Sequence, residues 1–392
     1  MSNKAGVKKV KGAETAGLVP RLRFPEFRGA GEWKEERIGD VLDYTRPEAY
    51  IVSSTKYENE GIPVLTANKS FVLGYTTEDW GIFQDVPVII FDDFTVDRKY
   101  VDFPFKVKSS AIKILKARGK NRIRFIFESM NQIRFDAAEH KRHYISTYRE
   151  LIVRMPEARE QQRIADCLSS LDEVITLEAK RLEALKVHKK GLMQQLFPAE
   201  GETVPKLRFP EFRGAGEWEE KPLGSVCEVL NNRRKPVSSS GREKGEYPYY
   251  GASGIVDYVR DYIFDERLLL VGEDGAKWGP FEKTAFIADG KYWVNNHAHV
   301  LRPIDASDTL LENYLTMVDI GPYVTGAAPP KLTLGKLKGI NVCLPPLMEE
   351  QQKIADCLSS LDEAITLESK KLDALKVHKK GLMQQLFPSS EV

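Results

Sequence analysis

The chain of 392 residues contains two segments twice, and this duplication limits its possible folds more than any other feature. Residues 19–33 read VPRLRFPEFRGAGEW and recur at 204–218 with a single change, Arg21 to Lys206. Residues 160–198 recur at 350–388 with five conservative changes, whereas the stretches between these segments do not resemble each other. Such a repeat is too long for a solenoid, so it predicts two similar units related by a pseudo-twofold axis.

The second repeated segment has the clearest helix signal in the chain. Pro156 precedes it, Glu160 favours the positive end of a helix dipole, and Pro198 follows it. From 164 to 196, apolar residues recur at alternating spacings of four and three, and the pattern returns from 354 to 386. This spacing predicts a heptad seam, and 33 helical residues correspond to about 50 Å.

The two helices are expected to pair with each other in antiparallel fashion, because a parallel pair would place like charges together in the seam. Two registers are possible. If facing residue numbers add up to 557, Glu178 faces Lys379 and Lys189 faces Glu368; if they add up to 550, the overlap is longer but leucines face these charges. Because an unpaired, partly buried charge costs several kcal/mol, we predict the 557 register. The residues expected to pair the helices are Leu171, Ile175, Glu178, Leu182, Leu185, Lys189, Leu361, Ile365, Glu368, Leu372, Leu375 and Lys379.

The fold class predicted is α+β: two globular α+β domains separated by two long helices that form an antiparallel coiled coil with pseudo-twofold symmetry. Strand-like runs such as Val86–Phe91 and Ala298–Leu301, and helix-like stretches near Ile123–Phe135 and Asp308–Val318, mark the domain interiors. The expected boundaries are 1–18 for a flexible N-terminal segment, 19–155 and 199–345 for the domains, 156–198 and 346–388 for the helices, and 389–392 for a tail.

The composition, with 42% hydrophobic and 29% charged residues, is typical of a globular protein. The apolar runs are only as long as strands, so no segment is expected to span a bilayer, and the Lys-rich start lacks the apolar core of a signal peptide. Four cysteines without CxxC spacing predict reduced thiols and a cytoplasmic location.

The sequence lacks the common catalytic and nucleotide-binding motifs GxxxxGK[ST], HExxH, GxSxG and GxGxxG. Asp93, Asp97 and Lys99 follow a strand-like run in a pattern that some metal-dependent nucleases have, although a polar turn is the simpler interpretation. The histidine pairs at 140/143 and 297/299 have no accompanying ligands with metal spacing. We therefore expect no catalytic residue, metal or cofactor in this chain.

Basic residues cluster locally, although the net charge of the whole chain is only +1. Residues 106–124 hold eight Lys and Arg and no acid, so we expect a basic face that binds phosphate through counterion release. Loops with Arg, Lys, Asn, Ser, Thr and His could read base edges, or could be ordinary polar turns. The candidate DNA-contacting residues are Thr66, Asn68, Lys69, Ser70, Lys106, Lys108, Ser109, Lys113, Lys141 and Arg142 in the first domain. In the second domain they are Arg233, Arg234, Lys235, Ser253, Lys277, Asn295, Asn296, His297, His299 and Lys331.

The order of these segments resembles the specificity subunit of type I restriction-modification systems. Each variable domain precedes a near-identical helix, which opens with PEAREQQRIADCLSSLDEVI at 156–175 or PPLMEEQQKIADCLSSLDEAI at 345–365. The lead-ins Trp33…Ile38-Gly39-Asp40 and Trp218…Leu223-Gly224-Ser225, and the approach Pro329-Pro330-Lys331-Leu332, agree with this resemblance.

The resemblance implies a non-catalytic subunit whose two target-recognition domains each contact one half of a bipartite double-stranded DNA site. Its implied partners are two modification subunits, which methylate adenine, and restriction subunits, which translocate and cleave DNA. S-adenosylmethionine, ATP and Mg would be bound by those partners, and the paired helices would act as a spacer and docking surface. Because the domains differ in sequence, we expect an asymmetric target with a fixed gap, and a 50 Å spacer corresponds to about 15 bp.

Three alternatives stay open. The chain could be a coiled-coil interaction scaffold without DNA binding, a nuclease built on Asp93, Asp97 and Lys99, or the specificity subunit of a methylation-only system.

Overall fold

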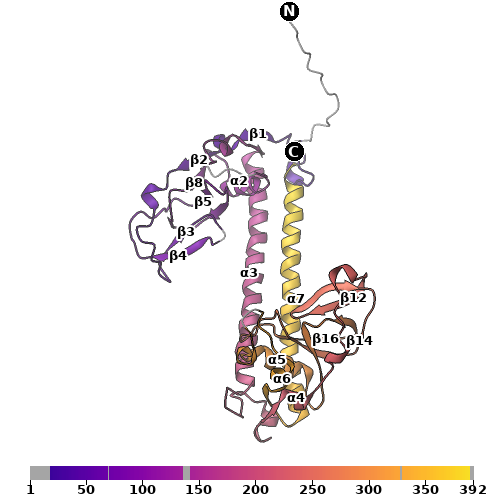
Figure 1. Cartoon of the computed structure of the whole chain (residues 1–392). Coiled ribbons are helices and arrows are strands. Elements are labelled where there is room, and N and C mark those ends of the chain that lie inside the picture. Colours follow the sequence, from indigo (N-terminus) through magenta and orange to yellow (C-terminus); the bar gives the residue numbers. More distant parts are fainter. Residues whose placement is uncertain (1–17, 69, 136–141, 327–328, 389–392) are drawn as a thin grey trace, which may run out of the picture. The chain divides into compact units, whose positions relative to one another are not determined.

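The computed structural model describes residues 18–68, 70–135, 142–326 and 329–388 (Figure 1). It divides into two compact units: unit 1 comprises residues 1–177 and 372–392, and unit 2 comprises residues 178–371. The repeated helical segments form α3 (Ala158–Leu196) and α7 (Met348–Leu386), each of 39 residues. Unit 1 therefore contains the start of α3 and the end of α7, and unit 2 contains the end of α3 and the start of α7.

The variable domain of unit 1 consists of small sheets and short helices. One antiparallel sheet has the order β2-β8-β5-β6, a second has the order β4-β3-β7, and β1 pairs with β9. All five residues of the central strand β5 are buried. The strands are β1 (Lys34–Arg37), β2 (Leu42–Thr45), β3 (Ile62–Leu65), β4 (Val72–Thr76), β5 (Val88–Asp92), β6 (Arg98–Val101), β7 (Lys106–Val107), β8 (Ile112–Ala117) and β9 (Ile152–Met155). The helices are α1 (Ile38–Val41) and α2 (Ile123–Met130).

The variable domain of unit 2 repeats this plan with a different sequence. Its sheets have the orders β11-β18-β15-β16 and β13-β12-β17-β14, and β10 pairs with β19. The strands are β10 (Glu219–Pro222), β11 (Cys227–Val229), β12 (Lys244–Gly251), β13 (Gly254–Val259), β14 (Phe264–Asp265), β15 (Leu268–Gly272), β16 (Ala285–Ala288), β17 (Lys291–Val294), β18 (Ala298–Pro303) and β19 (Asn341–Leu344). The helices are α4 (Leu223–Val226), α5 (Asp308–Met317) and α6 (Leu334–Lys338). The predicted α+β class is thus confirmed.

A buried ion pair joins each lead-in segment to the start of a long helix. Arg23 donates two hydrogen bonds to the Glu160 carboxylate, both of 2.7 Å, and Arg208 donates two bonds of the same length to Glu350. The exposed fractions of these four side chains are 8% or less. Two parallel N–H···O bonds between a guanidinium and a carboxylate are charge-assisted and directional. The two copies of the repeat therefore form the same clamp in both units.

The next repeated residue, a glutamine, holds the helix of each variable domain. The Gln161 side chain accepts the N–H of Arg122, directly before α2, and donates to the Pro156 carbonyl (2.9 and 2.8 Å). Gln351 accepts the N–H of Ser307, directly before α5, and donates to the Pro345 carbonyl (2.9 and 3.0 Å). The repeated Glu-Gln-Gln motif thus anchors one helix of the variable domain in each unit, although the two domains differ in sequence.

Within each unit the ends of α3 and α7 lie side by side in opposite directions. In unit 1, Lys379 of α7 bonds the Asp172 carboxylate of α3 (2.7 and 2.8 Å). In unit 2, Lys189 of α3 bonds the Asp362 carboxylate of α7 (2.6 and 2.7 Å). The antiparallel pairing is confirmed, and all twelve predicted pairing residues are buried or half-buried.

The register predicted from charge pairing is wrong. The contacts Asp172–Lys379 and Lys189–Asp362 fit facing numbers near 550 rather than 557. The lysines reach carboxylates beside the seam, so they need no glutamate opposite them. Glu178 instead contacts Lys371 and Glu368. The hydrogen bond between the two glutamates, together with burial, raises the pKa of Glu368. A lysine side chain is long enough to carry its charge out of the seam to a carboxylate beside it.

A double-mutant cycle tests this register. Asp172→Asn and Lys379→Met each remove one partner of a half-buried ion pair, and we expect a coupling free energy of about 1 kcal/mol in urea unfolding of the full chain. The control cycle combines Glu178→Gln with Lys379→Met, which face each other only in the 557 register, and should give a coupling near zero. A larger coupling in the control cycle contradicts the register described here.

Candidate nucleic-acid interface

In unit 2, polar side chains meet where β15 and β18 lie side by side. Glu273, directly after β15, accepts one hydrogen bond from the Arg234 guanidinium (2.5 Å), and its carboxylate lies 2.9 Å from Lys331 Nζ. Its carboxylate also lies 3.6 Å from Nδ1 of His299 on β18. Although burial opposes ionisation, the bonds from Arg234 and Lys331 keep the pKa of Glu273 below its usual value. Glu273 therefore ties two loops to the end of the sheet.

His299 forms an internal bridge in the same cluster. Its Nδ1 accepts a hydrogen bond from the Asn231 amide (2.8 Å), and its Nε2 donates to the Leu332 carbonyl (2.7 Å). The side chain is 1% exposed, and burial lowers the pKa of His299, so the ring is neutral. Both ring nitrogens of His299 are bonded inside the domain, which argues against its predicted contact with DNA.

Unit 1 has a carboxylate and a base in the same two positions. Asp93 directly follows β5, and Lys113 on β8 faces Phe91 as His299 faces Val271. The Asp93 carboxylate is 1% exposed, lies 3.3 Å from Lys113 Nζ, and accepts the N–H of Tyr144 (2.9 Å). The neighbouring Asp92 caps its own turn by accepting the N–H groups of Phe94 and Thr95. These bonds support the polar-turn interpretation over the nuclease hypothesis, because the Asp93 carboxylate is buried and bonded to groups of its own domain.

The predicted DNA-contacting residues fall into two groups by burial. Five of them are buried, each 6% exposed or less: Thr66, Lys106, Lys113, Asn295 and His299. Lys106 is ion-paired with Glu78 (2.7 Å) and donates to the Trp80 carbonyl (2.7 Å), so its ammonium group is bonded within the domain. The burial of these five side chains argues against direct DNA contact, which for them too stays a prediction.

The remaining candidates are accessible. The exposed residues are Asn68, Ser70, Lys108, Arg142, Arg233, Lys235, Ser253, Lys277, Asn296 and His297, and the half-buried ones are Ser109, Arg234 and Lys331. Lys69 and Lys141 lie outside the described residues. Asn68 and Ser70 flank one loop of unit 1, whereas Asn296 and His297 precede β18 in unit 2. The DNA contacts of these residues stay a prediction.

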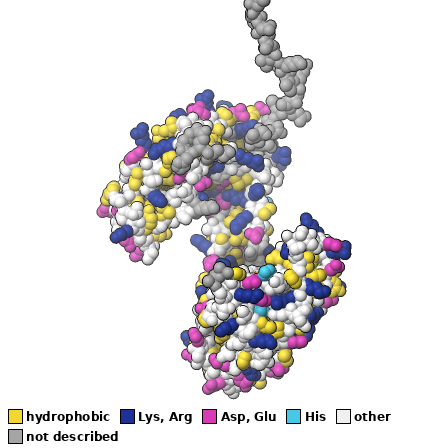
Figure 2. All heavy atoms as spheres, viewed as in Figure 1, with side chains coloured by type: hydrophobic (Ala, Val, Ile, Leu, Met, Phe, Trp, Pro, Cys, Tyr) yellow, Lys and Arg dark blue, Asp and Glu magenta, His cyan; other side chains and the backbone are white. Residues whose placement is uncertain are grey.

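The basic segment 106–124 does not form the expected uniform basic face. Lys106, Lys113, Lys116, Arg118 and Arg124 are all ion-paired with carboxylates of unit 1. On the side of the molecule in Figure 2, Lys and Arg side chains are mixed with Asp and Glu in both units. The cations of this segment that have no such ion pair, among them Lys108, are therefore scattered rather than gathered on one face.

The described residues contain no helix that is long and apolar enough to cross a membrane. Within the same ranges, no three His, Cys, Asp or Glu residues are placed to hold a metal ion. All four cysteines are free thiols.

Comparison with known proteins identifies the family. The model of the type I restriction modification DNA specificity domain matches residues 30–187 and, a second time, residues 215–377. The chain belongs to this family. Each match contains one variable domain and most of one long helix, so the specificity domain occurs twice, as the duplicated framework predicts.

The chain is similar to specificity subunits from several organisms. It is 37% identical over 251 residues to the EcoR124I/EcoR124II specificity subunit of Escherichia coli, with 59% of each chain covered. It is 40% identical over 149 residues to a type I specificity subunit of Haemophilus influenzae, covering 37% of this chain and 38% of the relative. These matches thus span between about a third and three fifths of the relatives' length. The fold resembles that of the S subunit from M. genitalium, with a TM-score of 0.71 at 17% identity, covering 95% of this chain and all of the other.

Residue types alone did not indicate that Glu273 and Arg234 are partners, and for the segment with Asp93 they allowed either a polar turn or a nuclease site. A signal for these carboxylates was present, because an acid follows the most apolar strand of each domain, at Asp92-Asp93 and Glu273-Asp274. Only the strand order shows that the two acids occupy equivalent positions.

The buried His299 predicts a pH-dependent stability. Because its pKa is lowered in the folded state, the unfolded chain binds more protons below about pH 6.5, and stability falls as the pH falls. Between pH 7 and 5.5 we expect His299 to account for a loss of about 1 kcal/mol in the free energy of unfolding.

Urea unfolding at both pH values measures this loss. His299→Gln, which keeps one donor and one acceptor, should reduce the pH dependence by that amount, whereas His378→Gln on the exposed face of α7 should leave it unchanged. Equal effects of the two substitutions would contradict a neutral, buried His299.

Proposed function

We propose that the chain is the sequence-recognition subunit of a type I restriction-modification complex and reads an asymmetric, two-part site in double-stranded DNA. The observation that carries this proposal is the double seat: two domains with unlike loops are held by identical clamps, Arg23–Glu160 and Arg208–Glu350. Membership of the DNA specificity domain family supports DNA as the ligand. Because the two variable domains are attached in the same way but differ in their loops, we expect them to recognise two different half-sites.

The accessible polar loops are the proposed readers. In unit 2, Asn296 and His297 precede β18, and the His297 ring bonds Asp274, which orients it. In unit 1, Asn68 lies beside Thr95, whose hydroxyl is 3.5 Å from the Asn68 side-chain oxygen. Amide side chains can bond adenine in the major groove with two bonds, whereas the accessible lysines and arginines suit phosphates. Ordered loops would hold these groups in place before DNA binds.

The exposed faces of the long helices are the proposed docking surface for two modification subunits. Large apolar side chains are exposed at equivalent places of the two copies, Leu177 and Leu367 at 64% and 71%, and Val187 and Val377 at 61% and 71%. Exposed apolar residues in a repeated pattern are typical of a protein interface. In this proposal the chain itself is non-catalytic, and S-adenosylmethionine, ATP and Mg are bound by the modification and restriction subunits.

A band-shift assay of the chain with its modification subunits tests this function. A specific complex with duplex DNA, displaced by unlabelled target but not by unrelated duplex, supports it. Assembly with the modification subunits without any DNA binding would instead establish the scaffold alternative. Methylation without cleavage of DNA, in cells that carry this chain and all of its partner subunits, would identify a methylation-only system.

Substitutions in one domain should affect one half-site. Asn296→Ala with His297→Ala should reduce discrimination in one half of the target about tenfold or more, since a good base contact contributes about 1–3 kcal/mol. Asn68→Ala with Ser70→Ala is the matched variant and should relax only the other half. Mapping of methylated adenines measures both, and a change in both halves from either variant contradicts separate readers.

The spacer role predicts that the gap follows helix length. Insertion of one heptad after Glu178 and another after Glu368 keeps the two helices in register and lengthens each by about 10.5 Å. The gap between methylated half-sites should then grow by about three base pairs. A single insertion in α3 is the mismatched control and should abolish methylation, and an unchanged gap in the double insertion contradicts the spacer role.

A further inference from the structure

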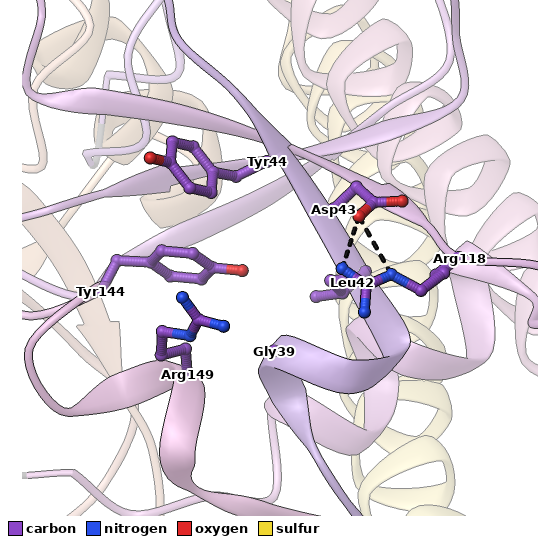
Figure 3. Close-up of a pocket in the computed structure, with 7 residues that line it drawn as sticks. All are labelled: Gly39, Leu42, Asp43, Tyr44, Arg118, Tyr144 and Arg149. Atoms are coloured by element: carbon purple, nitrogen blue, oxygen red, sulfur yellow. Dashed lines mark hydrogen bonds and ion pairs between the residues drawn. The ribbon is translucent and has the colours of Figure 1, made fainter.

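Unit 1 contains a small polar cavity next to the repeated Trp…Gly motif (Figure 3). It has a volume of about 200 Å³ and is lined by Gly39, Leu42, Asp43, Tyr44, Arg118, Tyr144 and Arg149. This volume is below that of sites for drug-sized ligands or cofactors, about 300 Å³ or more, so the cavity suits a single chemical group. Two arginines and one aspartate among the lining residues give it a net positive charge.

The aspartate does not neutralise both arginines. Asp43 accepts two hydrogen bonds from Arg118, at 3.0 Å from Nε and 2.6 Å from Nη2. Arg149 has a looser partner: its Nε lies 3.6 Å from Glu150, whose carboxylate is bonded by Arg37 at 2.8 Å. Among the described residues, no hydrogen-bond acceptor satisfies the Nε atom of Arg149. The Nε atom is itself enclosed, so a ligand would be bonded by the rest of the Arg149 guanidinium, which lines the cavity.

Tyr144 supplies a second donor. Its side chain is 2% exposed, yet in the described part of the chain no group forms a hydrogen bond with its hydroxyl, which points into the cavity beside the Arg149 guanidinium (Figure 3). Burial raises the pKa of Tyr144, against the opposing effect of Arg149 and Arg118, so the hydroxyl stays protonated and can donate. The hydroxyl is therefore available to donate a hydrogen bond to a group bound in the cavity.

The glycine of the repeated motif makes room for this arrangement. A Cβ atom at Gly39 would lie 2.9 Å from Arg149 Nε, so a larger residue would displace the guanidinium. In unit 2, a Cβ at Gly224 would lie 2.8 Å from the Cβ of Lys338, so a basic residue also packs on the equivalent glycine there. The motif thus seats a basic side chain in both units, and in unit 1 that side chain lines a cavity.

We propose that this cavity binds a phosphate group, with the Arg149 guanidinium and the Tyr144 hydroxyl as its donors. A guanidinium matches two oxygens of a phosphate, and the hydroxyl reaches a third. The phosphate could come from the DNA backbone or from a free phosphate compound, because both present the same oxygens. Its source in DNA would rest on the proposed function, whereas binding of the group itself does not.

Calorimetric titration of the full chain with inorganic phosphate, at constant ionic strength, tests the proposal. We expect saturable binding that Tyr144→Phe weakens about tenfold, since one charge-assisted hydrogen bond is lost. Arg149→Met, which keeps an aliphatic stem over Gly39, should abolish binding, and Arg28→Met at an exposed position should not change it. No saturable binding to the parent chain, or equal binding to the parent and Tyr144→Phe, overturns the proposal.

A second measurement identifies the source. The salt dependence of target binding is recorded for the parent and for Arg149→Met, both assembled with modification subunits. If the cavity takes a backbone phosphate, the slope of log K against log salt becomes shallower by about 1. An unchanged slope, with phosphate binding still lost in the calorimeter, assigns the cavity to a free phosphate compound. Failure of the parent to bind DNA would contradict the proposed function and leave the calorimetric result as the test of the cavity.

Discussion

The buried pair of arginine and glutamate is the contact on which both units depend. Arg23 and Arg208 come from the lead-in repeats, and Glu160 and Glu350 come from the starts of the long helices. Removal of one partner would leave a buried charge without compensation, which typically costs about 3–5 kcal/mol. Each pair fixes the point where the chain enters a domain relative to the point where it leaves, since β1 and β9, or β10 and β19, are adjacent there. The domain between these points is then free to vary.

This arrangement separates what is constant from what differs. The constant part is the clamp, the glutamine seat, and the lysine–aspartate contacts between helix ends. The variable part keeps one internal feature, a carboxylate at the end of the central strand, but uses it differently. Asp93 bonds the backbone of Tyr144, whereas Glu273 bonds the side chains of Arg234 and Lys331. Loops of different length and sequence can therefore be anchored at the same position of the sheet, which suits two readers of different half-sites.

Much of the fold could be predicted from the sequence because the signals are local or repeated. The heptad pattern predicted the two long helices, and apolar runs predicted the buried strands β5 and β18. The register between the helices could not be predicted from the seam residues alone, because their charges are paired with residues outside the seam. The reach of Lys189 and Lys379 to Asp362 and Asp172 beside it decides the outcome. The helix expected at Ile123–Phe135 ends at Met130, so its apolar continuation belongs to the following turn.

The candidate site was harder to predict, because burial of a polar residue depends on strand order. Lys106 and Lys113 belong to a strongly basic segment, yet the sheet places both inside unit 1 beside Glu78 and Asp93. His299 stands in a polar run, but its ring bridges Asn231 and Leu332. Asn68, Asn296 and His297 were chosen by residue type and loop position, and all three are exposed. The cavity around Tyr144 and Arg149 could be recognised only in the three-dimensional structure, because its lining residues lie far apart in the sequence.

Domain duplication tests the central claim, that one seat holds two readers, most directly. In this experiment residues 34–155 are replaced by a second copy of residues 219–344, so both seats carry the same domain, and methylated adenines are mapped with the modification subunits present. The account predicts that the asymmetric target becomes an inverted repeat of the second half-site. Methylation that stays at the original asymmetric target would contradict it.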